Sequence, residues 1–224
     1  MLSPETWAMI GKEMLNTLYM AGFSTLFGYI LGLPWGIVLA VTDAEGIGPN
    51  RTVYRVLDII TNIMRSIPFL ILLILIIPLT RLIVGKSYGS TATIVPLVVS
   101  AAPFIARMVE SSLKEVDNGV IEAAQAMGAD TMTIITKVLL VEARISLIIG
   151  VTISFATILG YSAMAGTVGG GGLGDVAIQY GYYRYQFDIM IVTVILLVAI
   201  VQVFQFVGMR LASRLDRRKA CEII

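Results

Sequence analysis

Few residues of this chain are of the types that carry chemistry. Its 224 residues include no histidine, the commonest metal ligand and general base, and a single cysteine, Cys221, which has no partner for an internal disulfide. The chain contains no GxxxxGK[ST] phosphate-binding loop, and the glycine run at 169–174 lacks the lysine and hydroxyl residue of such a loop. We therefore expect no catalytic residue, no metal site and no cofactor on this chain.

One charged residue, Arg65, lies within a long apolar segment that also contains Pro68 and Pro78. An arginine inside a membrane is costly unless it pairs with an anion or lines a polar cavity, so its position is informative. We predict a structural ion pair for Arg65; contact with substrate is the alternative. The candidate carboxylates are Asp58, two helical turns earlier on the same face, and Glu110.

The elements that must position these residues are apolar helices. Hydrophobic residues make up 57% of the chain and charged residues 14%, and the mean hydropathy is +0.88, whereas soluble domains carry roughly a quarter charged residues. A membrane-spanning helix needs about 20 mostly apolar residues. The sequence predicts an all-α integral membrane protein whose transmembrane domain, 14–209, has five spans, at about 14–41, 53–80, 87–109, 145–163 and 187–209.

The distribution of lysine and arginine predicts the orientation in the membrane. Eleven cations fall on one side of the five spans, including those of a basic tail at 210–224, and four fall on the other. Because positive residues favour the cytoplasmic side, we expect the amino terminus outside and the carboxyl terminus inside. No basic region precedes the first span, so we expect no cleaved signal peptide. The net charge of +1 gives no indication of a nucleic-acid partner.

The longest polar stretch between spans, at about 118–141, is predicted to form two short cytoplasmic helices. Asp117 or Asn118 can cap the first helix, and Gly128 is placed to end it in a left-handed conformation. Asp130 or Thr131 can cap the second, which is amphipathic.

This stretch resembles the EAA motif of bacterial ABC importer permeases, the cytoplasmic element that docks into a cleft of the ATPase subunit. The residues that carry the resemblance are Glu122, Ala123, Ala124, Gly128, Val138 and Leu140. The chain departs from the family at Val141, where a proline is usual.

Nearly the whole chain is similar, more narrowly, to the permease subunits of methionine importers. The matching runs are 65–69 (RSIPF), 101–110 (AAPFIARMVE) and 160–174 (GYSAMAGTVGGGGLG). The resemblance implies a type I ABC importer permease with five transmembrane helices and a coupling-helix pair in the bacterial inner membrane. It also implies a homodimer, two ATPase subunits that bind ATP and Mg, and an extracytoplasmic methionine-binding lipoprotein.

The same resemblance assigns roles to particular residues. In the coupling element, Glu122 either contacts basic groups of the ATPase or supports the helix start, Ala123 and Ala124 allow close approach, and Gly128 serves backbone geometry. Tyr161, Ser162 and Met164 lie at the end of the fourth span, in the last turn before the glycine run, where we expect them to line the translocation path. Met164 is the gate candidate, with ordinary packing between helices as the alternative. We interpret the glycine run as a tight turn facing the binding protein.

Three other functions remain as alternatives. A permease for another amino acid would share the fold and parts of these motifs. A secondary transporter or channel would be expected to carry intramembrane acidic residues or paired interrupted helices, of which the spans show little. An intramembrane enzyme would need a nucleophile with its base, or a metal cluster.

Overall fold

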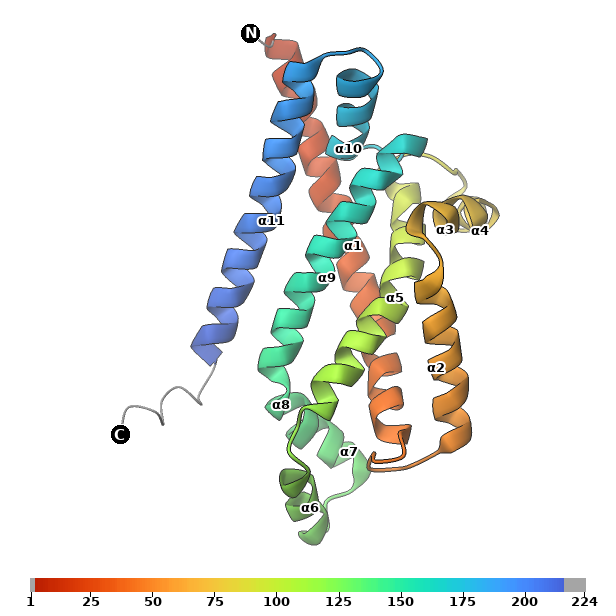
Figure 1. The fold of residues 1–224 in the computed structure, drawn as a ribbon, viewed down its shortest axis with the longest axis vertical. Coiled ribbons are helices and arrows are strands. Elements are labelled where there is room, and N and C mark those ends of the chain that lie inside the picture. Colours follow the sequence, from red (N-terminus) through yellow and green to blue (C-terminus); the bar gives the residue numbers. More distant parts are fainter. Residues whose placement is uncertain (1–2, 216–224) are drawn as a thin grey trace. The chain divides into compact units, whose positions relative to one another are not determined.

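The computed structural model describes residues 3–215, and every regular element in that range is a helix (Figure 1). Four helices are long and apolar enough to cross a membrane, and a fifth span is obtained if α2 and α3 count as one interrupted crossing. The four long helices are α1 (Pro4–Thr42), α5 (Ser90–Lys114), α9 (Arg144–Ala165) and α11 (Phe187–Leu215). Most of the apolar window of α11 is exposed, as expected where lipid is the solvent.

The segment predicted as one span at 53–80 is divided into three helices. They are α2 (Arg51–Ser66), α3 (Phe69–Leu75) and α4 (Ile77–Val84). Pro68 explains the first break, because proline has no N–H to donate and disfavours a helical conformation in the residue before it. Pro78 lies in the first turn of α4, where proline is tolerated, and α4 ends at Gly85 with a φ of +80°.

Short helices fill both connections beside α9. Before it come α6 (Asn118–Ala126), α7 (Thr131–Thr133), the π-helix η1 (Ile134–Leu139) and α8 (Leu140–Glu142). The second predicted coupling helix therefore has π-helical geometry along its middle. After α9 come the 3-10 helix η2 (Gly166–Val168), α10 (Gly172–Val176) and the π-helix η3 (Ala177–Tyr182).

The chain divides into two compact units. Among the described residues, the first unit contains 3–28, 67–101 and 154–205. One of its buried apolar clusters joins α1, α10 and α11 through Ile10, Leu173, Val176 and Ile189. The predicted glycine turn is present, with Gly169, Gly171 and Gly172 at positive φ.

The second unit contains 29–66, 102–153 and 206–215 of the described residues. Within it, α1 lies against α5 at Gly32 and Gly36. A Cβ added to Gly36 would lie 2.5 Å from the backbone oxygen of Ala106, so the two backbones are too close for a larger residue. The hairpin of α6 and α7 follows the carboxyl end of α5 and lies beside the loop between α1 and α2 (Figure 1).

The predicted basic tail at 210–224 is described only as far as Leu215. Arg210 and Arg214 lie in the last turns of α11, and the Arg144 guanidinium donates a hydrogen bond to the backbone oxygen of Leu215 at 3.3 Å. Cys221 and the tail cations after Leu215 lie outside the described residues.

Candidate functional site

Local hydrogen bonds form at both ends of α6, the first helix of the hairpin of α6 and α7. The Asp117 carboxylate caps α6 by accepting from the N–H of Gly119 at 2.8 Å. Gly128, which follows α6, has a φ of +80°, so the left-handed conformation predicted for it is confirmed. Its N–H donates to the backbone oxygen of Gln125 at 2.9 Å. These contacts satisfy one backbone donor at the start of α6 and one backbone acceptor at its end.

Asp130 caps the start of α7, one of the two residues predicted for that position. Its carboxylate accepts from the hydroxyl of Thr133 at 2.6 Å and from the N–H of Thr133 at 3.4 Å. The hydroxyl bond is the larger cause that holds the pKa of Asp130 below its ordinary value. The carboxylate therefore remains an ionised cap at neutral pH.

Within α6, the predicted coupling residues face different surroundings. Glu122 and Ala123 are exposed, whereas Ala124 is buried, and Gly128 beyond the helix is exposed. Glu122 and Ala123 are therefore accessible to a partner, while Ala124 packs into the second unit. The exposed side of the hairpin also carries Met127, one of the most exposed apolar side chains of the chain.

A cavity of about 310 Å³ lies beside α6 in the second unit. Its wall combines the loop after α1, the end of α5, α6 and one residue of η1. The polar lining residues are Asp43, Glu45, Lys114, Asn118, Glu122 and Gln125. The predicted coupling residue Glu122 and the last residue of α5, Lys114, thus line the same space.

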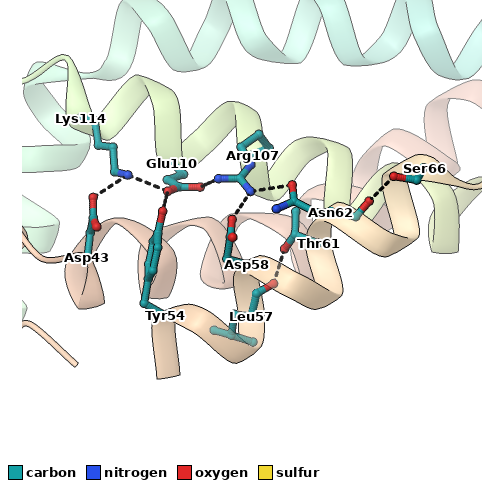
Figure 2. Close-up of polar contacts among 10 residues, drawn as sticks. All are labelled: Asp43, Tyr54, Leu57, Asp58, Thr61, Asn62, Ser66, Arg107, Glu110 and Lys114. Atoms are coloured by element: carbon teal, nitrogen blue, oxygen red, sulfur yellow. Dashed lines mark hydrogen bonds and ion pairs between the residues drawn. The ribbon is translucent and has the colours of Figure 1, made fainter. Parts of the chain in front are cut away.

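A network of charged side chains extends from this cavity along α5 (Figure 2). Its centre is Glu110, which is only 2% exposed. Its carboxylate accepts from Lys114 at 2.8 Å, from Arg107 at 2.7 Å and from the hydroxyl of Tyr54 at 3.2 Å. A buried carboxylate is costly unless it is paired and hydrogen-bonded, and three donors meet that requirement.

Each cation of the network also contacts a second anion. The Lys114 ammonium lies 2.6 Å from Asp43, in the loop after α1. The hydrogen bond from Lys114 is the largest cause that lowers the pKa of the Asp43 carboxyl, and partial burial opposes it. The Arg107 guanidinium pairs with Asp58 and donates to Asn62, so α5 is joined to α2 at several points.

The predicted pairing of Arg65 with Asp58 or Glu110 is wrong. Both carboxylates pair with Arg107 instead. Arg65 lies in the last turn of α2, where its side chain is exposed, and no ion pair is recorded for it among residues 3–215. The sequence did contain a signal for the network, because Arg107, Glu110 and Lys114 are spaced three and four residues apart, which places them on one face of a helix.

The predicted path residues lie in the first unit, where each has different surroundings. The Tyr161 ring stacks on Phe69 of α3 with their centroids 4.7 Å apart. Ser162 is buried, and its hydroxyl donates to the backbone oxygen of Leu159 at 2.7 Å. Met164 is 51% exposed. Of the three, Met164 is therefore the side chain most available to line a path or meet a second copy.

The glycine run is anchored within the first unit. The N–H of Gly172 donates to the Glu13 carboxylate at 2.7 Å, and the N–H of Leu173 donates to the Thr17 hydroxyl at 2.8 Å. Asp175 follows the glycine run in α10. Burial, and to a lesser extent the charge of Glu13, raises the pKa of its carboxyl. The turn is thus held against α1 by side chains of its own unit.

Comparison with known proteins identifies the family. Residues 32–220 match the family described as "Binding-protein-dependent transport system inner membrane component". The chain is 49% identical over 217 residues to the "Probable D-methionine transport system permease protein MetI" of Vibrio cholerae, covering 95% of this chain and 96% of that protein. It is 51% identical over 166 residues to the "D-methionine transport system permease protein MetI" of Escherichia coli K12, covering 74% and 76% of the two chains.

A solved structure agrees with these relatives. A chain of the MetNI methionine ABC transporter, in an inward-facing conformation, superposes with a TM-score of 0.95 at 48% identity, covering 96% of this chain and 100% of that one. The predicted all-α permease fold and the predicted family resemblance are confirmed. This chain belongs to the family of binding-protein-dependent transport system inner membrane components.

Proposed function

We propose that this chain is the permease subunit of an ATP-driven importer that carries methionine, as the D- or L-isomer or both, across the bacterial inner membrane. The observation that carries the proposal is the agreement over almost the full chain, at 48% identity and a TM-score of 0.95, with a chain of the methionine transporter MetNI. The names of the curated relatives support the same substrate.

The working assembly in this proposal is a homodimer of the permease with two ATPase subunits on the cytoplasmic side. A methionine-binding lipoprotein delivers substrate from the other side, with the amino terminus of the permease outside and the carboxyl terminus inside. ATP and Mg bind to the ATPase subunits, since the permease sequence has no GxxxxGK[ST] loop.

The hairpin of α6 and α7 is the proposed ATPase-coupling element. Its short capped helices favour transfer of a displacement, which a flexible loop would absorb. Exposed Glu122 and Ala123 are the proposed contact residues, Ala124 packs beneath them, and Gly128 sets the turn. In the membrane domain, Tyr161, Ser162 and Met164 are the proposed path residues, with Met164 as the gate.

Reconstitution tests the function directly. The permease, its ATPase and its binding protein are placed in liposomes, and uptake of D-methionine, L-methionine and other amino acids is measured with and without ATP. We expect ATP-dependent uptake of methionine. Preferred uptake of another amino acid would favour the second permease hypothesis. Uptake without any ATPase would instead indicate a secondary transporter or channel and overturn the mechanism.

A further inference from the structure

The last turn of α5 connects the charge network to the coupling element. Lys114 is the final residue of α5, and Asp117, the cap of α6, follows three residues later. The Lys114 ammonium lies 2.8 Å from Glu110, one turn earlier on α5, and 2.6 Å from Asp43 in the loop after α1 (Figure 2). One side chain, three residues before the cap of α6, therefore holds the end of α5 to the loop after α1 and also pairs with Glu110 on the preceding turn of α5.

We propose that Lys114 is a positioning residue for energy coupling. It fixes the end of α5, and hence α6, to the loop after α1 through Asp43, and to α2 through the Tyr54 ring and through Glu110, which accepts from the Tyr54 hydroxyl. A displacement of α6 by the ATPase then moves α2 with it. The inference rests on the proposed function, because it requires that α6 receives the motion of an ATPase.

The contacts of Glu110 extend this link to α2. The same carboxylate that accepts from Lys114 also accepts from Tyr54 and from Arg107, and Arg107 in turn pairs with Asp58. The Lys114 ammonium also lies 5.3 Å from the centre of the Tyr54 ring. Four charged groups and a phenol thus join the last turns of α5, which lead into α6, to α2 through polar contacts. Charge-assisted hydrogen bonds resist sliding because they are directional, unlike apolar contacts between helices.

The position of Lys114 suits a role in coupling as well as in folding. Its side chain is 40% exposed and lines the cavity beside Glu122. A partly exposed ion pair contributes little to overall stability. Arg107, by contrast, holds α2 to α5 without lining that cavity. Loss of the Lys114 ammonium should therefore loosen the connection at α6 while Arg107 keeps the rest of the network assembled.

The test compares Lys114→Met with Lys114→Arg in the reconstituted transporter. Methionine keeps a similar length without charge, and arginine restores the charge. Methionine uptake and ATP hydrolysis are measured on the same liposomes, and the readout is methionine transported per ATP hydrolysed. We expect Lys114→Met to lower this ratio about fivefold or more, within the usual range of coupling between sites. The basal ATPase rate should change less than about twofold, and Lys114→Arg should restore most of the ratio.

Two further variants sharpen the result. Asp43→Asn removes the loop side of the bridge and leaves Glu110 with its three donors, so it should also lower the ratio even if Lys114→Met fails to fold. Lys86→Met is the matched control, because Lys86 is an exposed lysine between α4 and α5 with no ion pair recorded in the described part of the chain. It should leave the ratio unchanged.

Three outcomes would overturn the role of Lys114 while leaving the proposed function intact. The first is an unchanged ratio in Lys114→Met. The second is a parallel loss of uptake and ATP hydrolysis at constant ratio, which would indicate a purely structural residue. The third is an unchanged ratio in Asp43→Asn. A wild-type transporter that takes up no methionine with ATP would instead contradict the proposed function itself.

Discussion

Single residues show how this membrane protein accommodates charge and close helix packing. Glu110 is a buried carboxylate on a helix long and apolar enough to span the membrane, and it is stabilised because Lys114, Arg107 and Tyr54 all donate to it. Gly36 contributes to the packing of α1 against α5 because it has no side chain, which allows the two helices to approach each other closely. Two of the donors to Glu110 lie on α5 itself and the third, Tyr54, lies on α2, whereas the requirement for glycine at position 36 is set by the neighbouring helix.

Replacing Gly36 by alanine should destabilise the protein. The added Cβ would lie 2.5 Å from the backbone oxygen of Ala106 and 2.6 Å from the Cβ of Val109, so α1 and α5 must move apart. We expect a loss of about 1–3 kcal/mol, the usual cost of overpacking. Thermal unfolding of the purified permease in detergent measures it.

Gly22→Ala on the same helix is the control for that experiment. A Cβ at Gly22 meets nothing within 4 Å, and alanine is the better helix former, by roughly 0.5–1 kcal/mol. The two substitutions should therefore change the unfolding temperature in opposite directions. Equal effects would show that helix propensity, and not the contact with α5, determines the result.

At the scale of elements, the hairpin of α6 and α7 is capped at the start of each helix. Asp117 and Asp130 cap the two helices, and Gly128 makes the turn between them. Asp117 and Asp130 act through their carboxylates and Gly128 through its backbone conformation, so we expect changes at these positions to alter the orientation of exposed Glu122 without changing its side chain. The hairpin can therefore be perturbed separately from its contact surface.

Gly128→Val should impair transport more than global stability. Space is available, since nothing lies within 4 Å of an added Cβ, but a φ of +80° is strained for any L-residue and most of all for a β-branched one. We expect the strain, about 1–2 kcal/mol, to distort the turn. Methionine uptake per ATP should fall, while the unfolding temperature changes little.

Gly128→Asn is the matched comparison, because asparagine tolerates the left-handed conformation. It should retain most of the transport activity. If asparagine impaired transport as much as valine, the role of Gly128 would be a direct close contact with the ATPase and not the geometry of the turn.

At the scale of the molecule, the boundary between the two units falls within long helices as well as between elements. Each of α1, α5, α9 and α11 contributes residues to both units. By contrast, the boundary between α2 and α3 falls at Ser66 and Ile67, next to Pro68, where the helix is already interrupted. The proposed coupling element lies in the second unit and the proposed path residues lie in the first. Coupling in the proposed mechanism must therefore pass from one unit to the other.

Met164→Ala tests the path at this scale. If two copies of Met164 seal an apolar constriction in the homodimer, removing the flexible side chain should open a leak. We expect methionine to leave loaded liposomes faster without ATP, or ATP to be hydrolysed without uptake. Unchanged leak and unchanged coupling would mean that Met164 only packs between helices, and the gate would be discarded.

Local features of the molecule could be predicted from the sequence because their causes are local. Charge-free stretches longer than 18 residues indicated the apolar helices, Asp117 and Asp130 precede the helices they cap, and Gly128 stands where a left-handed residue ends a helix. The quoted motifs were sufficient to indicate the permease family, because they extend along almost the whole chain. Pro68 was recognised in the sequence as a residue that can break a helix, but the sequence did not show that it would divide the predicted span into separate helices.

Only the tertiary structure decided which charges meet. Spacing showed that Asp58 shares a face with Arg65, but not that α5 packs against that face and supplies Arg107 as the partner. In the same way, nothing near the glycine run indicated that Glu13 and Thr17, more than 150 residues earlier, would accept its N–H groups. Spacing along a helix determines which side chains share a face. The packing of distant segments determines what that face contacts.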